Sequence, residues 1–365
     1  MKVAIVHYWL VNMRGGEKVI EALLDLFPNA DIFTHIYDPK EISDKIRSHR
    51  IYTTNISKFP FAKKLYQKYI SFMPNALMKL NLQSYDLIIS SESGPAKGII
   101  PNPDAYHICF CHSPMRYIWD MYYEYFENSG IITRFFMDIF ISKLRFWDVT
   151  SSNLVDRFIA NSHYVAKRIK RYYNRDADVV FVPVAIEDYS SIKREPEDFY
   201  LFFGQLVTYK RVDIALEACI KSGRKLVVAG AGGSDKEKKK YRNSPLVTFT
   251  GKLSDTEVKY YYSRAKALLF PGIEDLGIIP IEANAAGCPV IAYRKGGTLD
   301  TIKENVTGIF FNEQNPDSLI DAMEYFEANE SLFMQREPFI EHVAQFSKQA
   351  FLDRISRIIE EKKRV

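Results

Sequence analysis

The sequence predicts an α/β protein built from two domains, each with a parallel sheet flanked by helices. The chain has 365 residues, which at about 150 residues per domain indicates two medium-sized domains. Hydrophobic residues make up 47% of the chain and charged residues 26%, a balance that allows a large buried core. Short β-rich runs alternate with amphipathic helical stretches along most of the sequence, the pattern of parallel sheets with helices on both faces.

The expected strands fall into two series that are separated by a polar stretch. The first series is 3–7, 31–35, 86–90, 107–112, 157–160 and 179–182. The second is 199–203, 225–228, 247–250, 267–270, 290–293 and 308–310. The segment from Pro183 to Pro196 is interpreted as an extended interdomain linker. We therefore expect Rossmann-like domains at 1–185 and 196–345, facing each other across a cleft, and a C-terminal helix at 346–365 that crosses back to the first domain.

Charge and cysteine content narrow the class of function and the compartment. The 49 basic and 45 acidic residues give a formal net charge of +4, which is too even to favour nucleic-acid binding. The four cysteines lie in apolar surroundings, without the spacing of a redox pair or a zinc knuckle, which fits a reducing cytoplasm. No stretch approaches the ~20 apolar residues of a membrane span. We expect a cytoplasmic protein that meets a membrane, if at all, from the inner face.

The strongest candidate site follows the strand that ends at Phe270. In doubly wound sheets, ligands bind beyond the carboxyl ends of strands. Glycines, Gly277 among them, let the backbone turn here, and a helix is expected to begin near Ile278 with free N–H groups for a phosphate or sugar hydroxyls. Glu274 precedes this helix and Glu282 lies inside it, so both carboxylates are expected to face one ligand. The alternative is a pair of ordinary surface acids, against which the glycines and the strand context argue.

A second candidate site begins at the end of the strand 199–203. Lys210 and Arg211 are expected to open a helix that points toward the cleft, where a cation could neutralise a phosphorylated ligand. The alternative is a solvated pair of cations on a helix face. Residues 230–233 form a glycine turn after another strand, which we interpret as a ligand loop because the second half of a dinucleotide fingerprint is missing.

The first domain offers two further candidates. Residues Arg14–Glu17 form a glycine turn between the first strand and a helix, and this turn allows a phosphate to approach Gly16 closely. His112 ends the apolar strand expected at 107–112 and lies on the side of the predicted cleft. A connecting turn and a structural histidine are the respective alternatives.

These segments resemble the retaining family 4 glycosyltransferases of the GT-B fold. The motifs that carry the resemblance are CHSPMRY at 111–117, LVTYKRVD at 206–213, IEDLGIIPIEA at 273–283 and GCPVIA at 287–292, followed by Gly296-Gly297. They cover both domains in the expected order. Within the family they are most similar to bacterial mannosyltransferases that use GDP-mannose in surface polysaccharide synthesis.

The resemblance implies roles for individual residues. Glu274 is expected to contact the donor sugar, and Glu282 is expected to hold the ribose hydroxyls. His112 is expected near the reacting sugar, and Gly16 at the donor diphosphate or the acceptor. Each of these residues corresponds to a position of a family motif, so the roles follow from the resemblance and not from the spacing alone.

The diphosphate site departs from the family pattern. Lys210 matches the family lysine that binds the donor diphosphate, but Gln205 stands where the family has an arginine. Either Arg211 supplies the missing charge or the site is weaker than usual. The predicted catalytic residues are His112, Lys210 and Glu274. The predicted donor-binding residues are Gly16, Gln205, Lys210, Arg211, Glu274, Leu276, Gly277, Ile278 and Glu282, and neither a metal ligand nor a cofactor is predicted.

The resemblance implies transfer of a hexose to a glycan acceptor in cell-surface polysaccharide or O-antigen synthesis. The hexose is expected to be mannose from GDP-mannose, and the acceptor is expected to be lipid-linked. The anomeric configuration is retained, and the departing phosphate itself accepts the proton of the acceptor. Four alternatives stay open: a UDP-sugar-dependent transferase, a nucleotide-sugar 2-epimerase, a non-catalytic sugar-nucleotide sensor, and an NAD-linked oxidoreductase. The last requires a full G-x-G-x-x-G, which the sequence does not offer.

Residues 58–80 interleave basic and aromatic side chains and contain no acid. Such a helical stretch suits an anionic membrane surface that carries a lipid-linked sugar. A helix packed on the sheet with its lysines in water is an equal alternative. The expected partners are thus a nucleotide-sugar donor, a glycan or lipid-linked acceptor and, through 58–80, a membrane. The side chains concerned are Lys58, Phe59, Phe61, Lys63, Lys64, Tyr66, Lys68, Tyr69, Phe72 and Lys79.

Overall fold

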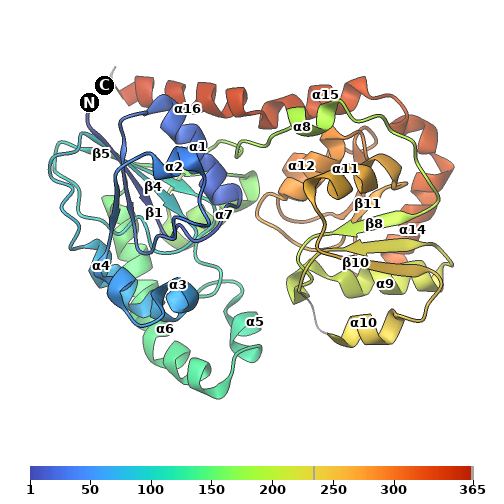
Figure 1. Cartoon of the computed structure of the whole chain (residues 1–365), viewed down its shortest axis with the longest axis horizontal. Helices are drawn as coiled ribbons and strands as arrows, with labels where there is room; N and C mark the ends of the chain where they lie inside the picture. The colour runs from blue at the N-terminus through green and yellow to red at the C-terminus, as the bar shows by residue number, and fades with distance from the viewer. Residues whose placement is uncertain (233–234, 363–365) are drawn as a thin grey trace. The chain divides into compact units, whose positions relative to one another are not determined.

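The computed structural model describes residues 1–232 and 235–362, and it divides the chain into two compact units. The first unit consists of residues 1–183 together with the C-terminal residues from 351 on, and the second consists of residues 184–350. Figure 1 shows a sheet with surrounding helices in each unit. Gly233, the last glycine of the predicted ligand loop, and the last three residues of the predicted C-terminal helix lie outside the described residues.

The first unit contains a seven-stranded parallel sheet in the order β3-β2-β1-β4-β5-β6-β7. All five residues of β1 are buried, because this strand lies between β2 and β4. The strands are β1 (Val3–His7), β2 (Asp31–Thr34), β3 (Ile51–Thr53), β4 (Leu87–Glu92), β5 (Tyr106–Cys111), β6 (Arg157–Ala160) and β7 (Ala177–Val179). The α-helices are α1 (Gly15–Leu26), α2 (Asp44–Arg47), α3 (Ala62–Leu65), α4 (Met73–Leu77), α5 (Tyr122–Glu127), α6 (Ile131–Ser151) and α7 (His163–Tyr173).

The second unit contains a six-stranded parallel sheet in the order β10-β9-β8-β11-β12-β13. The strands are β8 (Tyr200–Phe203), β9 (Leu226–Ala229), β10 (Val247–Gly251), β11 (Leu268–Phe270), β12 (Val290–Tyr293) and β13 (Gly308–Phe311). The α-helices are α8 (Glu187–Ser190), α9 (Val212–Lys221), α10 (Asp235–Tyr241), α11 (Asp255–Arg264), α12 (Ile278–Ala285), α13 (Thr298–Thr301), α14 (Pro316–Ala328) and α15 (Glu337–Val343). Short 3₁₀ turns connect several of these elements, among them η4 (Thr208–Lys210).

Both faces of the second sheet are buried. Tyr200 and Phe202 of β8 belong to one hydrophobic cluster, and Leu201 between them belongs to another. Because successive strand residues point to opposite faces, the two clusters lie on the two sides of the sheet. This explains why the strands appear in the sequence as continuous apolar runs rather than as alternating patterns.

The predicted two-domain Rossmann-like fold is confirmed, with two local differences among the strands. The strand expected at 179–182 is wrong in position. The observed strand β7 spans Ala177–Val179, pairs with β6, and ends at Val179, where the expected strand begins. The edge strand β3 was missed, since its three residues are too few to form a pattern.

Two other segments correct the sequence interpretation. Residues 183–196 are not an extended linker: they contain α8, and the guanidinium of Arg336 donates hydrogen bonds to the carbonyls of Tyr189 and Ser190. Tyr189 also packs edge-on against Tyr262, so this segment is part of the second unit. The stretch 58–80 is not one helix but the succession α3, the 3₁₀ turn η2 (Tyr66–Phe72) and α4, which packs on a small hydrophobic cluster.

The last helix, α16 (Lys348–Lys362), begins in the second unit and continues into the first. Its Phe351 ring packs against Phe110 of β5 with ring centroids 5.7 Å apart. Near its end, Glu361 accepts a hydrogen bond of 2.8 Å from Arg157 of β6. The C-terminal residues therefore complete the first unit, although they follow the second in sequence.

Candidate active site

Lys210 and Glu274 meet beyond the carboxyl ends of two neighbouring strands of the second unit. Lys210 ends η4, which follows β8, and Glu274 lies in the loop that follows β11. Since β8 and β11 are adjacent in the sheet, the loops after them can meet. The ammonium Nζ of Lys210 lies 2.7 Å from Oε1 of Glu274, and the two side chains are 12% and 19% exposed. The structure thus brings together two of the predicted catalytic residues.

Glycines make this close approach of two loops possible. A Cβ on Gly272 would lie 2.7 Å from the Cα of Lys210, so no other residue fits there without moving η4. A Cβ on Gly230 would lie 1.7 Å from the carbonyl oxygen of Gly204, in the loop after β8. From sequence, these glycines were interpreted as turn formers, but their role here is to let backbones touch.

The loop that carries Glu274 is fixed by the glycine pair 296–297. The N–H of Gly297 donates a 2.9 Å hydrogen bond to the carbonyl oxygen of Glu274. A Cβ on Gly297 would lie 2.3 Å from the Cα of Leu276, and one on Gly296 would lie 2.7 Å from the carbonyl oxygen of Glu274. The sequence showed this pair only as the continuation of a motif, whereas the structure shows that it seats the predicted sugar-binding carboxylate.

The helix α12 starts as predicted and carries the second carboxylate. Gly277 has a φ of +88° and precedes the helix, which begins at Ile278. Glu282 accepts a 3.4 Å hydrogen bond from the hydroxyl of Tyr262, and burial raises the pKa of its carboxyl group to about 7. The two glutamates therefore have different environments, one beside a cation and the other beside a phenol in an apolar surrounding.

Arg211 does not behave as predicted. It does not open a helix together with Lys210, because it adopts the left-handed conformation with a φ of +54° between η4 and α9. Its guanidinium forms an ion pair with Asp213, with 2.9 Å between Nη2 and Oδ2. This carboxylate compensates the charge that was expected to replace the family arginine. Gln205, in the arginine position, is exposed at the start of the loop after β8.

In the first unit, His112 belongs to a chain of polar side chains. It directly follows β5, is 9% exposed, and its Nε2 lies 2.9 Å from Oγ of Ser91. The same Oγ lies 3.0 Å from Nδ1 of His7, whose Nε2 faces Oε1 of Glu17 at 3.6 Å. Gly16, the second residue of α1, packs beside this chain. A Cβ on Gly16 would lie 3.3 Å from the His7 ring. Sequence reasoning found Gly16 and His112 but missed the residues that connect them.

The first unit also buries a lysine with two acids. Lys97 Nζ lies 2.7 Å from Oε1 of Glu92 and forms a second ion pair with Asp148, and all three side chains are fully buried. The Trp119 indole N–H donates a 2.7 Å hydrogen bond to Asp148. Burial raises the pKa of Glu92, although the charge of Lys97 opposes this. Sequence reasoning missed this cluster, because Asp148 lies 51 residues after Lys97 along the chain.

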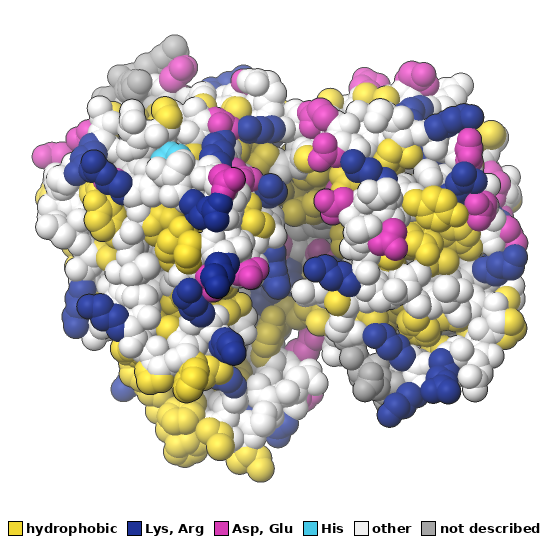
Figure 2. All heavy atoms as spheres, in the orientation of Figure 1, with side chains coloured by type: hydrophobic (Ala, Val, Ile, Leu, Met, Phe, Trp, Pro, Cys, Tyr) yellow, Lys and Arg dark blue, Asp and Glu magenta, His cyan; other side chains and the backbone are white. Residues whose placement is uncertain are grey.

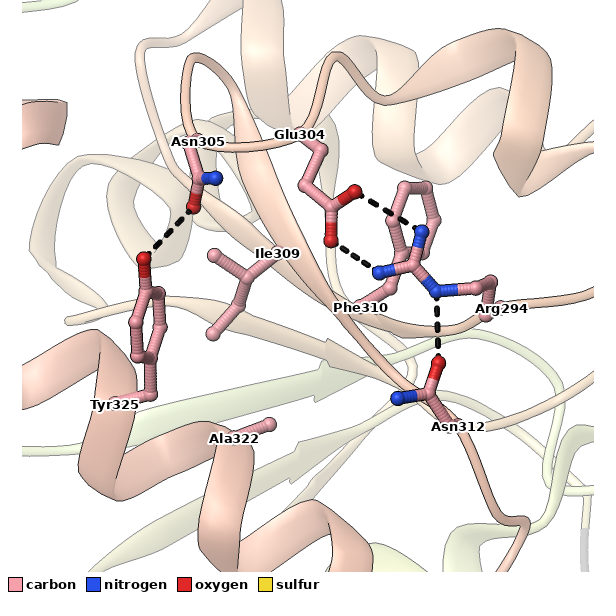
Figure 3. A pocket seen from close by; sticks show the side chains of 8 residues that line it. All are labelled: Arg294, Glu304, Asn305, Ile309, Phe310, Asn312, Ala322 and Tyr325. Atoms are coloured by element: carbon pink, nitrogen blue, oxygen red, sulfur yellow. Dashed lines mark hydrogen bonds and ion pairs between the residues drawn. The ribbon is translucent and has the colours of Figure 1, made fainter.

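A separate polar cavity of about 260 Å³ lies beside the edge strand β13. Figure 3 shows the Arg294 guanidinium between Glu304 and Asn312, and the hydroxyl of Tyr325 pointing to Asn305, to which it donates a 3.3 Å hydrogen bond. None of the residues that line this cavity is a predicted site residue.

The described residues offer neither a metal-binding cluster nor a helix that could span a membrane. Within 1–232 and 235–362, no three His, Cys, Asp or Glu side chains are grouped so that they could hold a metal ion. In the same part of the chain, no helix combines the length and the apolar character that crossing a bilayer requires.

Two protein-family models match the chain and together cover both units. The model described as glycosyltransferase family 4 matches residues 13–188, and the model described as glycosyl transferases group 1 matches residues 184–352. The chain belongs to the glycosyltransferases. With its two parallel sheets, this glycosyltransferase has the two-domain GT-B fold that the resemblance implied. Membership of this class sets aside the NAD-linked oxidoreductase.

The similar proteins include mannosyltransferases. The human α-1,3/1,6-mannosyltransferase ALG2 is 28% identical over 218 residues, which are 50% of this chain and 52% of ALG2. The GDP-mannose-dependent α-(1-6)-phosphatidylinositol monomannoside mannosyltransferase of Mycobacterium tuberculosis is 32% identical over 113 residues, 28% of this chain and 29% of that protein. The chain thus spans about half or less of the length of these relatives.

The fold agrees with solved structures over the whole chain. The lipopolysaccharide outer core galactosyltransferase WaaB superimposes with a TM-score of 0.70 and 17% sequence identity, covering 99% of this chain and 100% of that one. At this identity the likeness shows the fold alone.

Proposed function

We propose that this glycosyltransferase transfers mannose from GDP-mannose to a lipid-linked glycan acceptor in the synthesis of a cell-surface polysaccharide. The transfer retains the anomeric configuration of the sugar. The observation that carries the proposal is the pair of Lys210 and Glu274, a cation and a carboxylate held together beyond adjacent strands. The names of the human and mycobacterial relatives, one of them GDP-mannose-dependent, support mannose as the sugar.

Lys210 stabilises the departing diphosphate. Breaking the anomeric bond leaves negative charge on the diphosphate, and a positioned ammonium group stabilises that charge more strongly in the transition state than in the bound donor. The N–H groups at the start of α12, which begins at Ile278, add positive potential on the same side of the sheet. Glu274, paired with Lys210, binds hydroxyl groups of the sugar.

Glu282 binds the ribose hydroxyls through its carboxylate. Because burial raises its pKa to about 7, this carboxylate is fully formed only above neutral pH. Donor affinity should therefore increase between pH 6 and pH 8. A binding curve that is flat over this range would remove Glu282 from the ribose site.

A screen of sugar nucleotides tests the donor. Thermal unfolding is measured with GDP-mannose, GDP, UDP-glucose and UDP, and the largest increase in Tm is expected with the GDP compounds, since a ligand that binds only the folded state stabilises it. A larger increase with the UDP compounds would replace GDP-mannose by a UDP-sugar as the donor.

Product analysis separates the proposal from the two remaining alternatives. A 2-epimerase would convert the donor sugar without an acceptor, and a sensor would bind the donor but never release nucleoside diphosphate when an acceptor is offered. The transferase is expected to release GDP only with the acceptor present. We also propose that it does so without a divalent cation, so that excess EDTA leaves the rate unchanged; a rate restored only by Mg²⁺ would show the contrary.

We further propose that the first unit contacts the cytoplasmic face of a membrane. In residues 58–80, Phe61 is 76% exposed and Phe72 52% exposed, whereas the other aromatic rings pack inward. Lys68 donates a 3.1 Å hydrogen bond to Thr133, so this segment touches α6. Figure 2 shows hydrophobic side chains over the lower part of the unit, where Figure 1 places α6. The exposed apolar side chains of α6 include Ile131, Ile132, Phe135, Phe136 and Ile139.

Liposome flotation tests the membrane contact. Apolar side chains beside lysines should bind vesicles that contain anionic lipid and leave neutral vesicles unbound. The double substitution of Phe135 and Phe136 by Ser should abolish flotation, whereas Met334→Ser, which replaces an exposed side chain of the second unit, should not. Equal failure of the unmodified protein on both kinds of vesicle would end this proposal.

A further inference from the structure

Glu17, His7, Ser91 and His112 form a continuous buried chain in the first unit. We propose that the first three act as positioning residues, which decide which ring nitrogen of His112 carries its proton. The inference rests on the proposed function in one respect, namely that His112, as the family resemblance implies, lies near the sugar that is transferred. The arrangement of the four side chains stands independently of it.

The register of the sheet builds this chain. His7 of β1 pairs with Ser91 of β4, and Ser91 pairs with Phe110 of β5. Paired residues point to the same face, and His112 lies two positions after Phe110, so His7, Ser91 and His112 share one face. Helix α1 then places Glu17 over that face. The side chains of His7 and Glu17 are 0% and 2% exposed, which keeps solvent from competing for their contacts.

Glu17 is held as an oriented acceptor. Its Oε2 accepts a 2.9 Å hydrogen bond from the backbone N–H of Arg14, and its Oε1 faces Nε2 of His7 at 3.6 Å. Burial raises the pKa of this carboxyl group, but its contact with the His7 ring and the hydrogen bonds from backbone N–H groups bring it below its usual range. An ionised carboxylate can only accept, so it favours a proton on Nε2 of His7.

The proton on Nε2 of His7 determines the direction of the two hydrogen bonds that lead to His112. A neutral imidazole has one N–H, so His7 with its proton on Nε2 presents Nδ1 as an acceptor. Ser91 then donates its single hydroxyl proton to His7, at 3.0 Å, and its oxygen accepts from Nε2 of His112, at 2.9 Å. His112 is thereby held with its proton on Nε2 and with Nδ1 as the acceptor. A hydrogen-bond donor at position 17, in place of the acceptor Glu17, would reverse the direction of each of these bonds.

The substitution Glu17→Gln tests this inference, because it replaces a hydrogen-bond acceptor that faces His7 by a side chain that can donate. The glutamine carbonyl can keep the hydrogen bond from Arg14, while its NH₂ group faces Nε2 of His7. His7 must then carry its proton on Nδ1, Ser91 must donate to His112, and the proton of His112 must move to Nδ1. The measurement is ¹⁵N NMR of histidine-labelled protein at pH 8, where an unperturbed histidine with a pKa of about 6.5 is neutral.

The expected result is an exchange of the two nitrogen shifts of His112 in Glu17→Gln. Glu21→Gln, the same change one turn further along α1 at a residue that pairs with surface Lys18, should leave them unchanged. Ser91→Ala removes the bridging hydroxyl, so adding Glu17→Gln to it should have no effect on His112. Unchanged shifts in Glu17→Gln, or the same exchange with Ser91→Ala present, would overturn the inference.

The rate of sugar transfer tests whether the side chains that position His112 matter for activity. Residues that orient a functional histidine typically carry about 10–100-fold in activity. In Glu17→Gln, kcat should fall by this factor while KM for the donor changes little, because binding groups of the second unit are intact. An exchange of tautomer with kcat unchanged would overturn the role in transfer. Because the NMR result needs no substrate, its failure is distinguishable from a failure of the proposed function.

Discussion

Lys97 and Lys210 are both paired with carboxylates, but in different surroundings. Lys97 of the first unit is fully buried with Glu92 and Asp148, whereas Lys210 of the second unit is paired with Glu274 at the surface end of two strands. Burial makes the first cluster dependent on all its members, since a charge left without its partner cannot reach water. The second pair is partly exposed, at 12% and 19% of its two side chains. Charge pairing alone therefore does not mark a site; accessibility beyond a strand end does.

The largest effect is expected for Lys97→Met. Removing the ammonium group leaves two buried carboxylates without compensation, which should cost about 3–5 kcal/mol of the stability of the first unit. Tryptophan fluorescence during urea unfolding measures this directly, because all three tryptophans, Trp9, Trp119 and Trp147, lie in that unit. Lys18→Met, at an exposed lysine of α1, should change stability by less than ~0.5 kcal/mol. Equal effects of the two substitutions would contradict the comparison.

Glu282→Gln should stabilise the second unit at high pH. The carboxyl pKa rises from 4.5 to about 7 on folding. The protonated form is thus favoured in the folded state, and this stability is present below pH 4.5 and lost as the pH rises through 7. At pH 8 the loss amounts to about 3 kcal/mol, at 1.36 kcal/mol per pKa unit.

Hydrogen exchange of the second unit checks this expectation. Protection should increase in Glu282→Gln at pH 8 and remain similar at pH 4. Glu257→Gln, at an exposed capping residue of α11, should lack the gain at high pH. The gain in stability should be accompanied by weaker donor binding, and a gain without that weakening would separate the two roles of Glu282.

Lys210→Ala should lower kcat by about 10²-fold or more and leave stability nearly unchanged, the opposite of Lys97→Met. The substitution removes the cation expected at the leaving diphosphate. Steady-state kinetics with GDP-mannose and an acceptor provide the measurement, and Lys221→Ala, at an exposed lysine of α9, is the control. An unchanged rate would place Lys210 with Lys97 as a structural lysine.

The smallest effect is expected for Gln205→Arg. The guanidinium of Arg211 is paired with Asp213, so a cation at position 205 should add attraction for the diphosphate and lower KM for the donor by about tenfold. Gln205→Glu should raise KM. If both substitutions change KM in the same direction, Gln205 does not face the diphosphate.

The structural features that depend on local sequence pattern could be predicted from the sequence. Apolar runs located nearly every strand, and the glycine turn at Gly277 located the start of α12 at Ile278. The chain from Glu17 to His112 could not be predicted, because its contacts depend on the register between three strands. Lys97 lies in a stretch of small polar residues that resembles a surface loop, and only its distant partner Asp148 shows otherwise. The left-handed conformation of Arg211 likewise has no local signal.

The return of α16 to the first unit bears on how the two halves can be separated. A fragment that ends at residue 183 has every strand of the first sheet but lacks the helix whose Phe351 covers Phe110. Such a fragment would present an apolar ring to water and is expected to aggregate. Adding residues 351–362 as a separate peptide should restore it, so that the N-terminal half is made by complementation and not by truncation.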